Sequence, residues 1–211
     1  FELLTDDYSS EYIRETVQTL EQRMTEGWPC WAFSNHDVER VASRWSQNGE
    51  INPAQCKMLT ALLASLRGSV CMYQGEELGL GEASVAFEDL QDPYGITFWP
   101  NFKGRDGCRT PMPWEGNNTQ NAGFSAAKPW LPVDSAHTQQ AVSVQDKDAN
   151  SILNAYREFM TWRKQHTVLL AGDIKFIDTA EPILAFYRTL NEQTMLCVFN
   201  LADTNQTFEL T

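Results

Sequence analysis

The stretch Trp31-Ala32-Phe33-Ser34-Asn35-His36-Asp37 decides the fold class, because an apolar run ends there in an amide, an imidazole and a carboxylate. The apolar part predicts a short buried strand over residues 30–34. In a barrel of alternating strands and helices, catalytic side chains stand at the ends of buried strands. The stretch therefore indicates that His36 and Asp37 stand at the mouth of a barrel. Asn-His-Asp also suits an ordinary turn, so these residues alone leave a structural role open.

Hydrophobic spacing on both sides of this stretch predicts alternating helices and strands. Apolar residues recur three and four positions apart, which predicts amphipathic helices over residues 10–24, 53–66 and 151–166. Ser9 or Ser10 can begin the first helix, and Asn52 followed by Pro53 can begin the second. A second apolar run predicts a buried strand over residues 69–73.

The C-terminal part has a different pattern. After Gly172, short apolar runs predict strands over residues 174–177, 183–188, 195–199 and 207–210. Asn191-Glu192 predicts a hairpin turn within this part. An alternating region followed by a run of strands predicts part of an α/β layer and then a β domain.

Residues 80–148 form a long stretch that is rich in Gly, Pro, Trp, Asn and Asp and has little periodicity. A loop of this length in a compact domain is usually functional. It contains Gly104-Arg105-Asp106-Gly107-Cys108-Arg109-Thr110-Pro111-Met112-Pro113-Trp114, whose guanidinium, carboxylate and aromatic groups suit the hydroxyls and faces of a sugar. Together with the Asn-His-Asp turn, this segment favours carbohydrate chemistry.

The charge of the chain excludes some classes of partner. The 211 residues carry a formal net charge of −12, which argues against binding to nucleic acid phosphates or to an anionic membrane surface. No run of about 18 apolar residues predicts a membrane-spanning helix. No signal peptide is visible, but the chain begins at Phe1 and resembles a piece of something longer, so a signal could lie upstream.

The five cysteines are odd in number and have no CxxC spacing, so they predict neither a disulfide framework nor a zinc site. Most lie in apolar runs and are expected to be reduced core residues, which favours a cytoplasmic location. We expect no metal and no cofactor.

Four segments carry a resemblance to a known family: Asn35-His36-Asp37, Tyr73-Gln74-Gly75-Glu76-Glu77, Asp92-Pro93 and residues 104–114. In this order they resemble the α-amylase superfamily of glycoside hydrolases, most closely its α-glucosidase and oligo-1,6-glucosidase branch. The resemblance implies that residues 1–170 are the C-terminal portion of a catalytic (β/α)₈ TIM barrel, with about strands seven and eight. It also implies that residues 171–211 begin a C-terminal antiparallel β domain.

The resemblance further implies roles for single residues. The nucleophile Asp and the general acid Glu of the family would lie upstream of Phe1. Asp37 resembles the third carboxylate, which binds sugar hydroxyls and stabilises the positive charge that develops in the transition state. His36 would donate a hydrogen bond to the same ring. Arg105, with Arg109 as second choice, would contact the sugar at the cleaved bond, although either could instead form an Arg–Asp pair that only holds the loop together.

Other polar and aromatic residues have two interpretations. Glu76 and Glu77 point to opposite sides of an extended segment, so one could face the pocket, but a role in bracing the loop is favoured. Three tryptophans could stack on sugar faces, but we favour a role in anchoring the loop for Trp99, Trp114 and Trp130.

The sequence therefore predicts part of a retaining α-glucosidase that acts on short α-glucosides by hydrolysis or transglucosylation. The resemblance implies a short substrate, because Pro113 stands directly before Trp114 where relatives that cleave oligosaccharides often have Gln. The expected partner is a small oligosaccharide or α-glucoside, with no nucleic acid and no membrane. Because the nucleophile and the acid are missing, we expect the 211-residue chain alone to be inactive. A non-catalytic carbohydrate-binding or scaffold relative of the same fold is the alternative.

Overall fold

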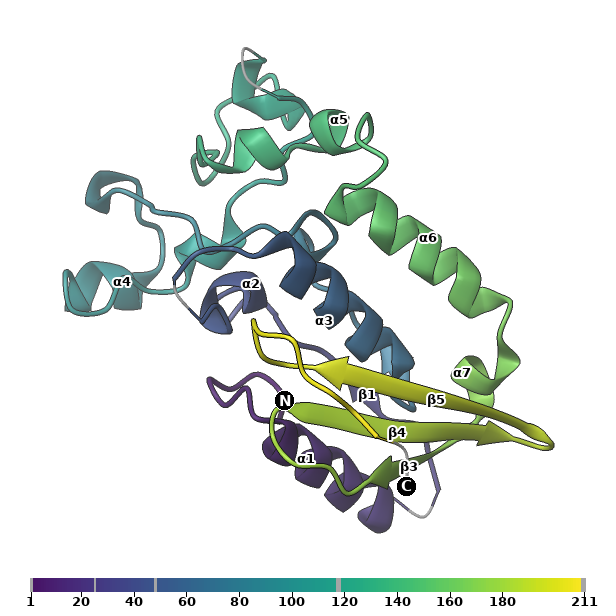
Figure 1. Cartoon of the computed structure of the whole chain (residues 1–211). Coiled ribbons are helices and arrows are strands. Elements are labelled where there is room, and N and C mark those ends of the chain that lie inside the picture. Colours follow the sequence, from purple (N-terminus) through teal and green to yellow (C-terminus); the bar gives the residue numbers. More distant parts are fainter. Residues whose placement is uncertain (1, 25, 48, 117–118, 210–211) are drawn as a thin grey trace. The chain divides into compact units, whose positions relative to one another are not determined.

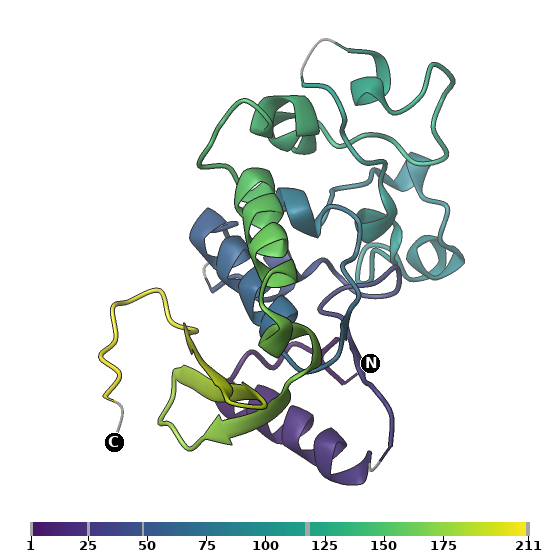
Figure 2. The same ribbon diagram turned by 90° about the vertical axis from the view of Figure 1, so that its right-hand side faces the viewer.

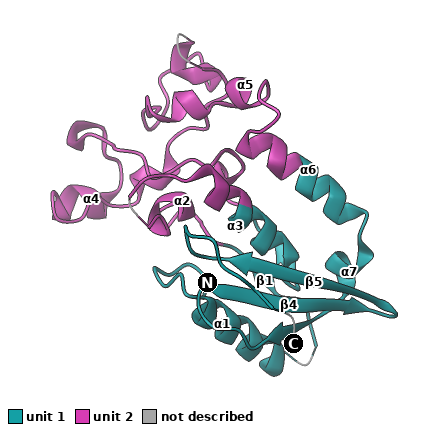
Figure 3. Ribbon diagram, viewed as in Figure 1, with its two compact units in different colours: residues 1–32, 58–71, 158–211 teal, residues 33–57, 72–157 magenta. Residues whose placement is uncertain are grey.

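The computed structural model describes residues 2–24, 26–47, 49–116 and 119–209 (Figure 1). The chain divides into two compact units whose segments interleave along the sequence (Figure 3). Unit 1 comprises Phe1–Ala32, Met58–Cys71 and Glu158–Thr211, and unit 2 comprises Phe33–Lys57 and Met72–Arg157. The predicted division at residues 170 and 171 stays a prediction.

The first helix of unit 1, α1 (Ser10–Arg23), agrees with the helix predicted over residues 10–24. It begins at Ser9, whose hydroxyl accepts a hydrogen bond from the backbone N–H of Tyr12 at 3.1 Å. Ile13 and Val17 are fully buried one turn apart, so one face of the helix contributes to the core. Figures 1 and 2 both show α1 lying beside the C-terminal sheet.

The two predicted barrel strands are present, but they are shorter than the apolar runs. β1 (Cys30–Trp31) pairs in parallel with β2 (Ser69–Val70), and Cys30 lies opposite Ser69. Beyond this pair the ladder ends with the N–H of Cys71 donating to the carbonyl of Trp31 at 2.9 Å. The chain then turns because side chains such as Asn35 bond to the backbone and compete with strand pairing.

The C-terminal sheet is antiparallel, with strand order β3 (Asp173–Ile177), β4 (Ile183–Leu190) and β5 (Gln193–Asn200). The predicted hairpin turn joins β4 to β5, and Asn191 adopts the left-handed conformation with φ of 53°. The fourth predicted strand is wrong over residues 207–209, which have no strand structure; Leu210 lies outside the described residues. Figure 2 shows this last segment leaving the sheet.

A buried arginine ties this sheet to the rest of unit 1. The side chain of Arg188, in β4, is fully buried and donates to the backbone carbonyls of Ser65 at 2.6 Å and Gly172 at 2.8 Å. A weaker contact joins it to the carbonyl of Asp173 at 3.3 Å. Burial lowers the pKa of Arg188 to about 10, and the carbonyls partly replace the water that it has lost. The short helix α7 (Thr167–Ala171) leads into the sheet.

Unit 2 holds most of the long irregular stretch. It is built from short helical turns between loops, and small apolar clusters hold it together. One cluster is Ala42, Cys56 and Ile152, and another is Leu78, Leu80 and Leu153. A third comprises Val85, Leu90 and Leu131. The short helical elements of unit 2 are α2 (Val41–Arg44), Glu76–Leu78, Phe87–Asp89, α4 (Pro93–Phe98), Asp106–Arg109, Gln120–Gly123, His137–Gln140 and α5 (Val142–Gln145).

Two longer helices contribute residues to both units. They are α3 (Pro53–Ser65) and α6 (Ile152–Lys164), and each agrees with a predicted helix to within two residues at either end. Asn52 begins α3 as expected, because its side-chain oxygen accepts the N–H of Ala54 at 2.9 Å.

The cysteines are all free and most of them are buried, as predicted. Cys56, Cys108 and Cys197 are buried, whereas Cys30 and Cys71 are exposed in the described chain. Both exposed thiols lie in or directly after the paired strands β1 and β2. Within the described ranges no helix is both long and apolar enough to cross a membrane.

Candidate functional site

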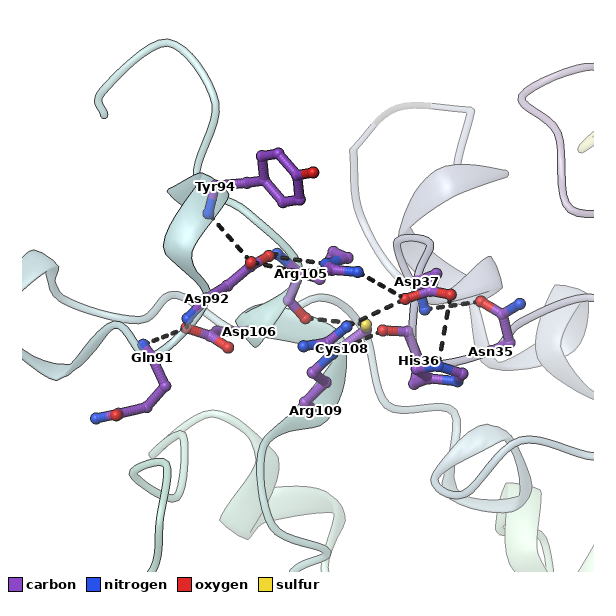
Figure 4. Close-up of polar contacts among 10 residues, drawn as sticks. All are labelled: Asn35, His36, Asp37, Gln91, Asp92, Tyr94, Arg105, Asp106, Cys108 and Arg109. Atoms are coloured by element: carbon purple, nitrogen blue, oxygen red, sulfur yellow. Dashed lines mark hydrogen bonds and ion pairs between the residues drawn. The ribbon is translucent and has the colours of Figure 1, made fainter. Parts of the chain in front are cut away.

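The candidate site lies in unit 2 and begins at the turn that follows β1. The N–H of Asp37 donates to the side-chain oxygen of Asn35 at 2.8 Å, which fixes the turn (Figure 4). The hydroxyl of buried Ser34 accepts the N–H of Val41 at 2.9 Å and closes the loop behind it. Nε2 of His36 lies 3.4 Å from Oδ2 of Asp37. The side chains of His36 and Asp37 are 68% and 47% exposed, so both are accessible from solvent.

Two arginines from the helical turn at residues 105–109 converge on Asp37. Nη1 of Arg105 lies 3.0 Å from Oδ1 of Asp37, and Nη2 of Arg109 lies 3.1 Å from the same oxygen. Nε of Arg109 also donates to the backbone carbonyl of His36 at 2.7 Å. All four predicted site residues are therefore neighbours. Both guanidinium groups bind Oδ1 of Asp37, whereas Oδ2 of Asp37 contacts the His36 ring.

A buried carboxylate fixes the guanidinium of Arg105. Nε of Arg105 donates to Oδ2 of Asp92 at 2.9 Å, and Nη2 donates to Oδ1 at 3.1 Å, which is a bidentate pair. The N–H of Arg105 also donates to Oδ2 of Asp92 at 2.8 Å. The Arg105 guanidinium holds the pKa of the Asp92 carboxyl well below its usual range. The ring of Tyr94 lies 5.5 Å from the guanidinium carbon, within the range of a cation–π contact.

A second buried carboxylate supports the first. Oδ2 of Asp106 accepts the backbone N–H of Gln91 at 2.6 Å and of Asp92 at 2.7 Å. The backbone around Gly104 also packs closely against the backbone of Gly95. Gly104 has φ of +78°, and a Cβ there would lie 2.8 Å from Cα of Gly95. The glycine before Arg105 is therefore required by both its conformation and its packing.

A polar hollow of about 400 Å³ opens beside Asp37. Its lining comprises Asp37, Val38, Glu39, Glu82, Phe102, Lys103, Gly104 and Arg105. Burial raises the pKa of the Glu82 carboxyl to about 7, and its Oε2 accepts the N–H of Arg40 at 3.2 Å. The exposed ring of Phe102 adds an apolar surface to a hollow that several charged groups also line.

Three buried or half-buried charges brace the loops behind the hollow. The guanidinium of Arg40 is fully buried, donates to the carbonyl of Gln74 and lies 5.3 Å from the ring of Tyr73. Glu76 accepts the N–H of Tyr73 at 3.2 Å, and burial raises its pKa to about 7. Glu77 accepts the N–H of Gly75 at 2.7 Å. These contacts agree with the predicted bracing role of Glu76 and Glu77.

Sequence reasoning placed Asp92 and Asp106 in its motifs without giving either a role, and it missed Arg40. Asp92 had a signal, because an Asp directly before a Pro predicts a helix start, and Asp92 does begin α4. That pattern gave no indication that the same carboxylate binds Arg105. Neither Arg40 nor Asp106 carries a local signal, since a buried charge is recognised only by its tertiary partners.

The three tryptophans expected to anchor the long loop are partly exposed, although Trp99 packs on Phe87 of the same loop with ring centroids 5.6 Å apart. Trp99, Trp114 and Trp130 are 36%, 49% and 64% exposed. Smaller apolar side chains also hold the loop, as the cluster of Val85, Leu90 and Leu131 shows. In the described part of the chain, no three His, Cys, Asp or Glu side chains are grouped so as to hold a metal ion.

Comparison with known proteins identifies the family. The sequence pattern of the alpha-amylase catalytic domain matches residues 4–172. The chain belongs to the alpha-amylase family. The match to this family, together with the small antiparallel sheet that follows the barrel strands and helices, confirms the predicted fold class.

Among curated relatives of the chain, a probable alpha-glucosidase of Rhizobium meliloti (strain 1021) is 48% identical over 211 residues, covering 100% of the chain and 38% of the relative. An oligo-1,6-glucosidase of Parageobacillus thermoglucosidasius is 30% identical over 203 residues, covering 87% of the chain and 36% of the relative. The chain thus spans well under half the length of these relatives.

Solved structures resemble the chain over the same extent. The alpha-glucosyl transfer enzyme XgtA is 61% identical, with a TM-score of 0.90, and the match covers 95% of this chain and 37% of XgtA. The trehalulose synthase MutB from Pseudomonas mesoacidophila MX-45 is 26% identical, with a TM-score of 0.78, and the match covers 92% of this chain and 38% of MutB. The chain is therefore similar, in sequence and in structure, to glucosidases and glucosyl-transfer enzymes of the family.

Proposed function

We propose that the chain is part of a retaining α-glucosidase that acts on short α-glucosides. The arrangement that supports this most directly is the carboxylate of Asp37, held on one oxygen by Arg105 and Arg109 and open on the other. An ionised carboxylate in this position binds two neighbouring hydroxyls of a sugar ring. It also stabilises the positive charge that grows at the anomeric carbon as the glycosidic bond breaks.

The division of labour between the two Asp37 oxygens follows from their contacts. Oδ1 is occupied by two guanidinium groups, so it serves to fix the carboxylate. Among the described residues Oδ2 contacts the imidazole of His36, and a sugar hydroxyl would bind beside that ring. His36 would donate to the same ring, and the free donors of the two guanidiniums would reach an adjacent hydroxyl.

The covalent chemistry would require two more carboxylates. Retaining glycosidases use a nucleophile and a general acid about 5 Å apart on either side of the scissile bond. Glu76 and Glu77 cannot supply this pair, because both are bound to backbone N–H groups of their own loop. In the full-length parent, a nucleophile Asp and an acid Glu would come from residues before Phe1, and water or a second sugar would release the glucosyl group.

The experiment that tests this proposal uses the full-length parent. Once the reading frame upstream of Phe1 is recovered, the purified protein is incubated with p-nitrophenyl α-D-glucopyranoside and with maltose. We expect glucose to be released as the α-anomer, which proton NMR detects before mutarotation. At high sugar concentration we also expect transfer products. Binding of sugar without any turnover would instead favour the non-catalytic relative.

A further inference from the structure

Both carboxylate oxygens of buried Asp92 accept hydrogen bonds, and the proposed function gives this side chain no role. We propose that Asp92 is a positioning residue that aims the guanidinium of Arg105 at Asp37 and at the sugar. This inference rests on the proposed α-glucosidase function, since it concerns the same reacting ring.

The contacts of Asp92 account for both of its carboxylate oxygens. Oδ2 accepts Nε and the backbone N–H of Arg105, at 2.9 and 2.8 Å. Oδ1 accepts Nη2 of Arg105 at 3.1 Å and the N–H of Tyr94 at 3.2 Å. The side chain is 0% exposed, so no water competes for these donors. A charge-assisted bidentate pair in this setting has one strongly preferred geometry.

The donors of Arg105 are divided between its two carboxylates (Figure 4). The edge formed by Nε and Nη2 faces Asp92, and Nη1 faces Asp37. A guanidinium is planar, so fixing one edge also fixes the direction of the remaining nitrogen. Asp92 thereby determines where Nη1 points, although it lies too deep to touch a sugar.

The base of this arrangement is itself rigid. Asp106, fully buried, binds the backbone N–H of Asp92 and of the residue before it. Asp92 also begins α4, so its backbone is fixed on both sides. Arg109 binds Asp37 from a different side and has no contact with Asp92 among the described hydrogen bonds, so it cannot replace the direction that Asp92 gives to Arg105.

A purely structural role is the competing explanation, because Asp92 also caps α4. The two roles differ in their dependence on Arg105. A positioning effect disappears once the Arg105 guanidinium is gone, whereas a capping effect does not. A double-mutant cycle therefore separates them.

The experiment measures kcat and KM of the full-length parent on p-nitrophenyl α-D-glucopyranoside for wild type, D92N, R105A and D92N/R105A. Wild-type turnover tests the proposed function and does not depend on Asp92. Given an active wild type, D92N should lower kcat about 100-fold, as a displaced catalytic geometry does, with a much smaller change in KM. In the R105A background the same change should lower kcat about twofold or less. An equal loss in both backgrounds, or no loss in wild type, would overturn the proposal.

Two further variants keep the test decisive if D92N folds poorly, which a thermal melt reveals. R105K retains the charge, but a lysine cannot bind Asp92 through two nitrogens while a third points at Asp37. R105K should therefore reproduce the kcat loss expected for D92N. D146N is the matched control, because it breaks the exposed Asp146–Arg157 pair elsewhere in unit 2 and should leave kcat unchanged. Wild-type kcat in R105K would refute the proposal without reference to D92N.

Discussion

Nη1 of Arg105 lies 3.0 Å from Oδ1 of Asp37, although the two residues are 68 positions apart in the sequence. One residue follows a short strand and the other belongs to a helical turn in a long loop. Because of this contact the loop is part of the candidate site and not only a connection between helices and strands.

Arg109→Lys should reduce kcat/KM of the full-length parent about tenfold. The change removes the two donors that bind Asp37 and the carbonyl of His36 together, and a lysine can reach only one of them. Steady-state kinetics on p-nitrophenyl α-D-glucopyranoside measures the effect. Arg157→Lys, in an exposed ion pair, is the control. Equal kcat/KM values for the two variants would mean that Arg109 has no part in the site.

The buried carboxylate of Glu76 should make stability depend on pH. Burial raises its pKa to about 7, so between the ordinary glutamate value and pH 7 the folded state binds a proton that the unfolded state releases. The free energy of unfolding should therefore fall as pH rises through this range, by roughly 3 kcal/mol at most for one group.

Glu76→Gln tests this directly, because a neutral side chain cannot titrate. Urea unfolding at several pH values between about 5 and 8 should show a smaller slope for this variant than for wild type. Glu82, whose pKa burial also raises to about 7, would account for part of the slope that remains. An unchanged slope in the Glu76 variant would show that the carboxylate ionises in the folded state with little cost.

Arg188→Ala should destabilise the protein by about 3 kcal/mol or more, because it leaves buried carbonyls without a donor. Those carbonyls belong to Ser65, Gly172 and Asp173. Arg188→Lys should recover part of the loss, since one ammonium can satisfy some of them. The midpoint of chemical denaturation measures both variants, and a midpoint for the alanine variant equal to that of wild type would contradict the role given to this arginine.

The 211-residue chain by itself should not hydrolyse p-nitrophenyl α-D-glucopyranoside. Asp37 stabilises charge in the proposed mechanism but does not attack or protonate the glycoside, and the bracing contacts of Glu76 and Glu77 prevent them from doing so. Release of p-nitrophenol by the purified chain, above a blank, would refute this division of roles.

The helices could be predicted from sequence because their signals are local. The apolar spacing of α1 and the caps at Ser9 and Asn52 need no distant partner. The strand ends could not be predicted in the same way: Phe33 and Tyr73 continue apolar runs, yet both lie beyond the short β1–β2 ladder. Strand length depends on a partner, which the hydrophobic pattern of one segment does not describe.

Of the candidate site, only the residues that belong to recognisable motifs could be predicted from the sequence. Asp37, His36, Arg105 and Arg109 could be grouped through a family resemblance, and the structure places them together. An Arg–Asp pair at Arg105 agrees with an alternative that the sequence left open, but its partner Asp92 could not be identified, because an Asp before a Pro predicts a helix start and nothing about its distant partner. Buried charges are specified by tertiary contacts, so sequence spacing alone does not reveal them.

The central claim is that Asp37 stabilises the reacting sugar, and one comparison tests it most directly: kcat/KM of the full-length parent and of Asp37→Asn on p-nitrophenyl α-D-glucopyranoside. Asparagine keeps the size of the side chain but removes the charge. We predict a loss of about 100- to 1000-fold, as expected when a fixed electrostatic group is removed from a transition state. A folded Asp37→Asn variant with wild-type kcat/KM would contradict the account.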